Sequence, residues 1–296
     1  MKKKLYIIVN LIFIFTAFYF LTKMITSSSA LHLMARRESI TYIIIAVLVI
    51  MLVHCLKALR FYLILFEQKI PFRRFIKLYI KTTFINITLP FKSFEIFRIY
   101  CYGREIKNYE IGILGVLIDR FFDTCVLIVI LIPYEILKYK SLSILSFVIL
   151  AFVLFFTTIY FLFPTTYRYF NKFLVLNVWS KNVIPMLEHF ERASKWDAYS
   201  KQLLKGRAST ILLLSCLAWG VECFALFDLS KMCGFSFTMN DFIIYLNSAF
   251  TIGKNELLII YVCLSSIVFA LITVIIYTAS YIKTEVKKNE QSIMRI

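Results

Sequence analysis

The most constraining feature of the sequence is a series of apolar runs, each about twenty residues long and nearly free of charge. The first run, residues 5–22, contains no charged side chain and at 1.5 Å per residue is about long enough to cross a bilayer core. Similar runs recur along the chain, and 60% of the 296 residues are hydrophobic. Soluble domains contain only roughly 45 to 50% apolar residues. We therefore predict an all-α integral membrane protein, with residues 1–296 as one polytopic domain.

Hydropathy predicts about six full transmembrane helices. They lie near residues 5–22, 40–66, 111–134, 142–163, 209–229 and 257–282. The first run also has features of a signal peptide, but its apolar stretch exceeds the usual length of roughly 7–15 residues, so a retained helix is favoured. Two further apolar segments, residues 75–90 and 242–250, are too short to span. They are predicted to be half-spans that re-enter the membrane or lie at its interface.

Positive charge orients these segments. The chain has 34 Lys and Arg against 17 Asp and Glu, which in an apolar protein indicates loops facing anionic lipid headgroups. Residues 165–207 form the longest basic stretch and are predicted to be a cytoplasmic loop of one or two amphipathic helices. Both termini are then cytoplasmic in a cell inner (cytoplasmic) membrane, and the two half-spans enter from opposite faces. This pattern is compatible with an inverted repeat, although amphipathic surface helices would give it too.

Charged residues inside the predicted spans mark the candidate site. Three of them, Asp119, Arg120 and Asp123, lie near the bilayer midplane, where each charge costs on the order of 2.5–3.5 kcal/mol. Arg120 can reach Asp123 at the i+3 position. The spans also contain Lys57, Arg60 and Glu222, which gives three positive and three negative charges. A neutral buried network is the simplest consequence.

This network has two interpretations. It either fixes helix packing alone, or it surrounds a polar cavity for a charged lipid headgroup, with Lys57 and Arg60 meeting the phosphate. Arg60 suits phosphate better, because a guanidinium binds two oxygens at once. After Pro90, a predicted helix places Glu95 and Arg98 on one face, either as part of such a site or as a surface ion pair.

The order of these residues resembles the lysylphosphatidylglycerol synthase transmembrane family. Its "P…GE..R", "(E/D)R..D" and "W..E" elements are matched in turn by Pro90, Glu95 and Arg98, by Asp119, Arg120 and Asp123, and by Trp219 and Glu222. The family includes the flippase portion of the bacterial multiple peptide resistance factor and the membrane part of an archaeal dolichyl-phosphate glycosyltransferase. This chain has Phe94 where the family usually has glycine, and it lacks the usual Pro-Gly-Gly element near residues 251–256.

The resemblance implies a flippase-like protein that binds or translocates an anionic or aminoacylated phospholipid or a polyprenyl-linked glycolipid. Arg60, Arg98, Arg120 and Lys57 would contact phosphate, while Glu95, Asp119, Asp123 and Glu222 would balance charge or meet an amino headgroup. The alternative is a non-catalytic accessory subunit of envelope polysaccharide or glycolipid synthesis, with a glycosyltransferase or synthase partner.

No enzymatic activity is expected. The three histidines are scattered, no nucleophile, P-loop or HExxH pattern occurs, and the sequence lacks the aminoacyl-transferring domain of full-length resistance factors. The seven cysteines include no CxxC pair and are predicted to be small apolar residues of the membrane core, not metal ligands. We expect no cofactor, no metal and no nucleic-acid partner.

Overall fold

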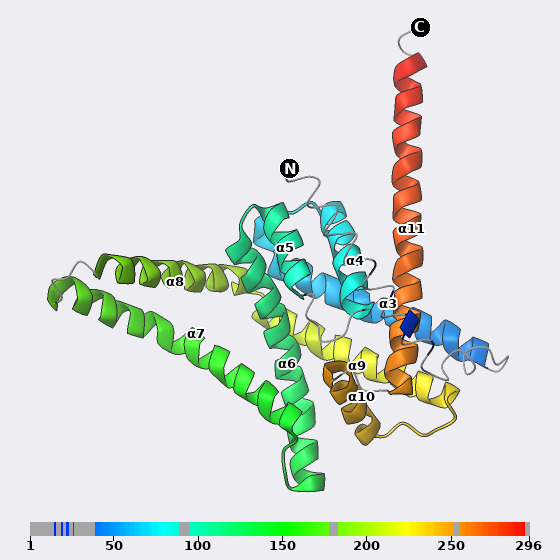
Figure 1. The fold of residues 1–296 in the computed structure, drawn as a ribbon, viewed down its shortest axis with the longest axis horizontal. Coiled ribbons are helices and arrows are strands. Elements are labelled where there is room, and N and C mark those ends of the chain that lie inside the picture. Colours follow the sequence, from blue (N-terminus) through cyan, green and yellow to red (C-terminus); the bar gives the residue numbers. More distant parts are fainter. Residues whose placement is uncertain are drawn as a thin grey trace. The chain divides into compact units, whose positions relative to one another are not determined.

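The computed structural model describes residues 39–88, 95–177, 183–251 and 255–293, together with the single positions 15, 19, 22, 23 and 26. Over these ranges the chain is helical and contains no strand (Figure 1). The elements are α3 (Ser39–Ile64), η1 (Phe66–Gln68), α4 (Phe72–Thr88), α5 (Glu95–Ile106), α6 (Tyr109–Tyr139), α7 (Ile144–Asn177), α8 (Val183–Leu204), α9 (Ala208–Met232), α10 (Met239–Thr251) and α11 (Glu256–Ile293). The predicted all-α fold is confirmed for this part of the protein.

Four helices in the described ranges are long and apolar enough to cross a membrane: α3, α7, α9 and α11. They correspond to the predicted spans near 40–66, 142–163, 209–229 and 257–282. Helix α6 contains the predicted span 111–134 and has 31 residues, but its charged residues keep it out of this group. The predicted span 5–22 lies outside the described ranges, so the count of six spans stays a prediction.

The two predicted half-spans are short helices. Helix α4 has 17 residues and α10 has 13, both below the roughly twenty needed to cross the hydrocarbon core. Pro90, the predicted end of the first half-span and its re-entrant motif, lies outside the described residues.

Helix α7 corrects one prediction. The predicted span ends near residue 163 and the predicted loop begins at residue 165, but α7 runs through Pro164 to Asn177 without a break. Proline lacks the amide hydrogen for one backbone hydrogen bond, but the neighbouring turns keep their hydrogen bonds. Proline is also more frequent in transmembrane helices than in the helices of soluble proteins. The region 165–207 contains helix, as predicted, but its first helix is the continuous end of α7 and its second is α8.

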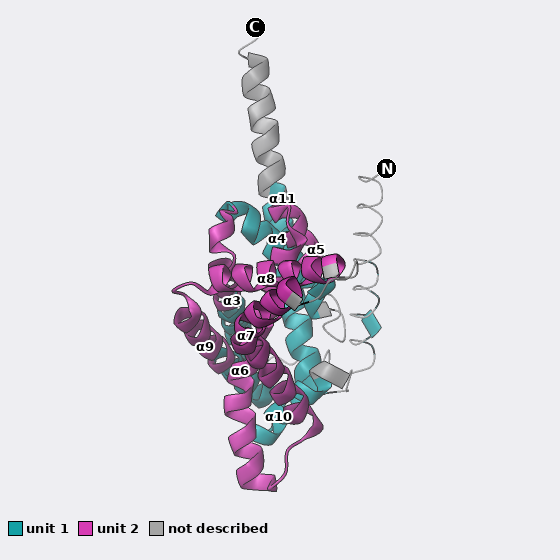
Figure 2. Cartoon of the chain, turned by 90° about the vertical axis from the view of Figure 1, so that its left-hand side faces the viewer, with its two compact units in different colours: residues 1–54, 71–98, 221–296 teal, residues 55–70, 99–220 magenta. Residues whose placement is uncertain are grey.

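The chain divides into two compact units, coloured separately in Figure 2. Unit 1 contains residues 1–54, 71–98 and 221–296, and within it α4 packs along α11. Unit 2 contains residues 55–70 and 99–220, and within it α6, α7 and α8 pack against one another in pairs. The prediction of a single polytopic domain stays a prediction.

The start of α6 positions the charged cluster of unit 2. Asn108 caps this helix, because its side chain accepts hydrogen bonds from the amides of Glu110 (2.9 Å) and Ile111 (3.2 Å). One turn later the backbones of α5 and α6 touch. A Cβ atom added to Gly112 would lie 2.9 Å from the nitrogen of Gly103 and 3.1 Å from the carbonyl oxygen of Ile99. Glycine at position 112 therefore permits this close packing and fixes α6 against α5.

Candidate functional site

The first candidate site is an ion cluster inside unit 2, centred on Arg60 of α3. The Arg60 side chain is fully buried, and its Nε donates to Oδ1 of Asp119 at 2.8 Å. Its two terminal nitrogens donate to the Asp123 carboxylate, one of them to Oδ2 at 3.1 Å, and Nη1 also donates to Ser215 Oγ at 2.9 Å. All donor groups of this guanidinium are directed at partners from α6 and α9, so Arg60 joins three helices.

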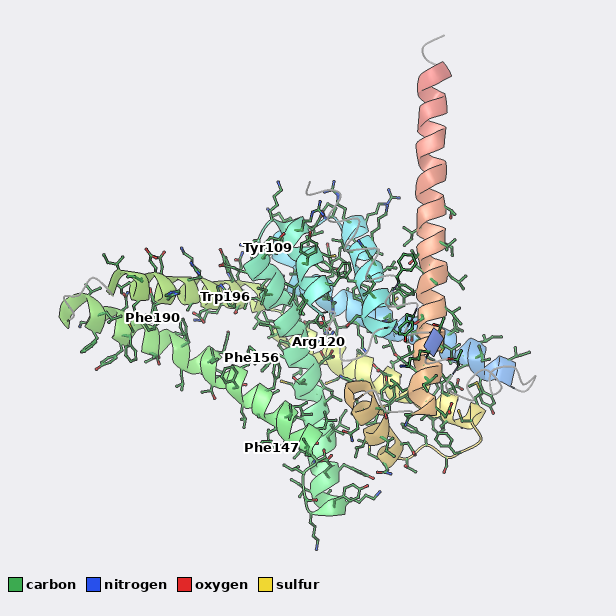
Figure 3. All side chains as sticks on the ribbon, in the orientation of Figure 1. Tyr109, Arg120, Phe147, Phe156, Phe190 and Trp196 are labelled. Carbon is green, nitrogen blue, oxygen red and sulfur yellow. The ribbon has the colours of Figure 1, made fainter. Side chains whose placement is uncertain are left out.

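Arg120 completes the ion cluster at its edge. Its Nη2 lies 3.0 Å from Oδ2 of Asp119, and its Nη1 lies 3.2 Å from Oδ2 of Asp123, the contact expected from the i, i+3 spacing. The Arg120 side chain is 26% exposed, whereas that of Asp119 is 1% exposed. Figure 3 labels Arg120 on α6.

Two arginines and two aspartates make the ion cluster neutral. Each isolated charge in this environment would cost several kcal/mol, and mutual pairing with good geometry offsets that cost. Lys57 lies one turn before Arg60 and is close enough to interact electrostatically with Asp123. Its ammonium lies 5.3 Å from the centroid of the Trp219 ring, a cation–π arrangement within unit 2.

The second candidate site is a polar centre inside unit 1, which begins where α4 meets α5. The Nδ2 of Asn86 donates to Oε1 of Glu95 at 3.1 Å, and Arg98 Nη1 lies 3.9 Å from the other carboxylate oxygen. The Arg98 guanidinium also lies 5.6 Å from the centroid of the Tyr79 ring. Because Tyr79, Thr82 and Asn86 follow i, i+3, i+7 spacing, α4 presents one polar face here.

The polar centre continues on α9, α10 and α11, because Tyr261 of α11 is close enough to Tyr79 of α4 and to Glu222 of α9 to interact electrostatically with both. Tyr245 donates its hydroxyl hydrogen to Oε1 of Glu222 at 2.9 Å, and its ring lies 6.0 Å from that of Tyr261. Three hydroxyl groups of α11 are buried and have no hydrogen-bond partner among the described residues: those of Tyr261, Ser265 and Ser266. A buried polar group without a hydrogen-bond partner costs about 1–3 kcal/mol. These hydroxyls can therefore form hydrogen bonds with a bound ligand.

The structure distributes the predicted site residues over both units. Arg60, Lys57, Asp119, Arg120 and Asp123 lie in unit 2, where four of them form the ion cluster. Glu95, Arg98 and Glu222 lie in unit 1 and belong to its polar centre. The predicted roles of these residues toward a lipid stay predictions.

Sequence reasoning missed several polar residues. Ser215 lies within a predicted apolar span and was not singled out, although it accepts a hydrogen bond from Arg60. Tyr261 and Ser265 are spaced i, i+4 in the last span, a stripe that would have indicated a polar helix face.

No group of three or more His, Cys, Asp or Glu side chains stands ready to hold a metal ion in the described part of the chain. The cysteines are free thiols.

Comparison with known proteins now adds to this geometry. The model of the family described as lysylphosphatidylglycerol synthase TM region matches residues 6–252. Comparisons with curated proteins and with solved structures gave no match. The matched region includes the ion cluster of unit 2 and the Glu95, Arg98 and Glu222 side chains of unit 1. The chain therefore belongs to the lysylphosphatidylglycerol synthase transmembrane family.

Proposed function

We propose that this protein binds the polar headgroup of a membrane lipid and acts as a flippase-like protein without enzymatic activity of its own. The lipid is an anionic or aminoacylated phospholipid or a polyprenyl-linked glycolipid. The observation that carries the proposal is the group of unpartnered buried hydroxyls in unit 1, from Tyr261, Ser265 and Ser266. Lipid tails cannot form hydrogen bonds with such hydroxyls, whereas the oxygens of a phosphate, a glycerol or a sugar can.

The charges around these hydroxyls support a headgroup ligand. Arg98 suits a phosphate because its guanidinium presents several donors in one plane. Glu95 and Glu222 offer carboxylate oxygens to an ammonium or to hydroxyl groups. The polar centre thus contains positive and negative charges as well as hydroxyl groups. A zwitterionic or polyol headgroup requires such a combination.

In unit 2 the ion cluster suggests a division of roles. Arg60 contacts both carboxylates by itself, so Arg120 can turn toward a phosphate without leaving Asp119 or Asp123 unpaired. Arg120 is also the more exposed of the two arginines. We therefore assign the phosphate contact in this unit to Arg120 and a positioning role to Arg60, with Lys57 nearby.

A translocation assay tests the proposal. The protein is reconstituted into liposomes that contain fluorescent phosphatidylglycerol, and dithionite reports the fraction of probe reaching the outer leaflet. The wild type should speed exposure of the inner probe. Tyr261→Phe, which deletes one hydroxyl and keeps the ring, should slow it roughly two- to tenfold, the worth of one neutral hydrogen bond.

Tyr160→Phe is the matched control, because Tyr160 lies on α7 and is 37% exposed. It should leave the rate unchanged. If the folded wild type accelerates no anionic, aminoacylated or polyprenyl lipid, the flippase-like role fails. An accessory role in envelope synthesis, in an inner membrane with both termini cytoplasmic, would then take its place. The six charges of α8 would offer such a partner a polar helix surface.

A further inference from the structure

The C-terminal end of α7 extends beyond the part of that helix needed to cross a membrane. Helix α7 has 34 residues, so it is about 51 Å long, whereas a bilayer core is about 30 Å thick. Its residues 144–163 carry no charge and suffice for the crossing. The last turns, from residue 165 to 177, therefore reach the headgroup region at one surface.

These last turns have two different faces. One face packs on α8: the Phe170 ring stacks on that of Phe190 with centroids 6.1 Å apart, and Leu174 is buried (Figure 3 labels Phe190 on α8). At about 100° per residue, Arg168 and Lys172 fall on the opposite face, and both are exposed. Tyr167, Asn171, Val175 and Leu176 share this open face of α7 with Arg168 and Lys172.

The positive charge of this face is uncompensated. Neither Arg168 nor Lys172 has a carboxylate within ion-pair distance in the described ranges. On α8, by contrast, Lys195 pairs with Glu191 at 2.9 Å and Lys201 with Asp197 at 2.6 Å. Helix α8 carries three basic and three acidic residues and is balanced. The basic character predicted for residues 165–207 is thus concentrated, among the described helices, at the end of α7.

We propose that the Arg168/Lys172 face of α7 binds the headgroup of an anionic phospholipid from the surrounding leaflet. The two cations lie one turn apart and can share a phosphate, which Arg168 can contact through two nitrogens. The Tyr167 ring and the Asn171 amide suit the interfacial depth, and Val175 and Leu176 offer apolar surface to the glycerol and upper acyl carbons. This lipid stays bound at the membrane surface and holds the α7–α8 hairpin there, independently of the proposed translocation.

Native mass spectrometry of the full chain in detergent tests this proposal. Phosphatidylglycerol and phosphatidylcholine are titrated separately, and bound lipids are counted for the wild type and for Arg168→Gln/Lys172→Gln. The wild type should retain phosphatidylglycerol over phosphatidylcholine. The double variant should bind its tightest phosphatidylglycerol roughly thirtyfold more weakly, because each basic residue near an anionic surface contributes about a fivefold factor.

Arg192→Gln/Lys195→Gln on α8 is the matched control and should bind as the wild type does. Equal phosphatidylglycerol binding by the wild type and the α7 double variant would overturn the proposal, as would an equal loss in the α8 control. Millimolar inorganic phosphate should not displace the lipid. Displacement by phosphate alone would show an anion site that does not select a lipid and would also overturn the proposal. Because the α7 face is exposed, both variants should keep the wild-type elution volume in size-exclusion chromatography.

Discussion

Replacing Arg60 by methionine should destabilise the protein strongly. The substitution keeps an unbranched apolar side chain of similar reach but removes the buried guanidinium that donates to Asp119, Asp123 and Ser215. Within the ion cluster, Arg120 is then the one cation left to pair with the two carboxylates. The ion cluster itself would then carry a net charge of −1, in a site where the Asp119 side chain is 1% exposed.

The expected loss is about 3–5 kcal/mol in the free energy of unfolding, the cost typical of breaking a buried ion pair by removing one partner. A loss of about 4 kcal/mol shifts the unfolding equilibrium by roughly a thousandfold. Adding Asp123→Asn to Arg60→Met restores neutrality, with Arg120 paired to Asp119. The double variant should therefore recover at least about 1 kcal/mol relative to Arg60→Met, although Asp123→Asn alone is itself destabilising.

Reversible unfolding in mixed dodecylmaltoside and dodecyl sulfate micelles, followed by tryptophan fluorescence or circular dichroism, measures these values. Arg192→Met is the matched control, because Arg192 is exposed on α8 and should change stability by less than about 0.5 kcal/mol. A loss below about 1 kcal/mol for Arg60→Met would refute the argument that Arg60 compensates two buried carboxylates. So would a double variant whose loss equals the sum of the two single losses, since the charges would then be uncoupled.

Three further predictions concern packing, capping and thiol reactivity. Gly112→Ala should cost about 1–3 kcal/mol in the same unfolding assay, because its Cβ would meet backbone atoms at 2.9 Å, whereas Gly220→Ala, with nothing within 4 Å, should cost none of that. Asn108→Ala should cost about 1 kcal/mol through loss of the α6 cap, and an unchanged stability would contradict the capping role. Burial raises the pKa of the Cys233 thiol to about 11, so little thiolate exists at pH 7 and maleimide labelling in a variant retaining only Cys233 should speed up nearly tenfold per pH unit towards pH 11. An exposed cysteine introduced by Ser141→Cys should label rapidly near pH 8, and equal rates for both thiols at that pH would contradict the shift.

The positions of the apolar helices could be predicted because membrane spans depend on local composition alone. Helices α3 and α9 begin and end within a few residues of the predicted limits. A rule that ends helices at proline could not predict that α7 continues beyond Pro164. The proline removes one backbone hydrogen bond, but the neighbouring turns keep their own hydrogen bonds. A hydropathy window also takes Arg168 and Lys172 for the start of a loop, although charged side chains at a membrane surface are fully compatible with a helix.

The candidate site was only partly predictable for a different reason. The equal numbers of positive and negative charges in the spans predicted a neutral network. The pairing of Arg120 with Asp123 followed from their i, i+3 spacing on a helix. The partners of Arg60 lie 59 and 63 residues away along the chain, and only the packing of α3 against α6 identifies them. The hydroxyls of α11 escaped notice because isolated serines and tyrosines are ordinary in apolar helices, and only their shared burial sets them apart.

The proline inside α7 also has a mechanical consequence. Since Pro164 has no amide hydrogen, the carbonyl group of Tyr160 lacks its usual donor four residues along, and the helix resists bending least at this level. We therefore expect α7 to bend most readily near Pro164, where its charge-free part ends. When the bilayer becomes thinner or thicker, the crossing part can change its tilt while the outer part keeps its angle to the membrane surface. We expect such bending to reduce the effect of bilayer thickness on the orientation of the α7–α8 hairpin.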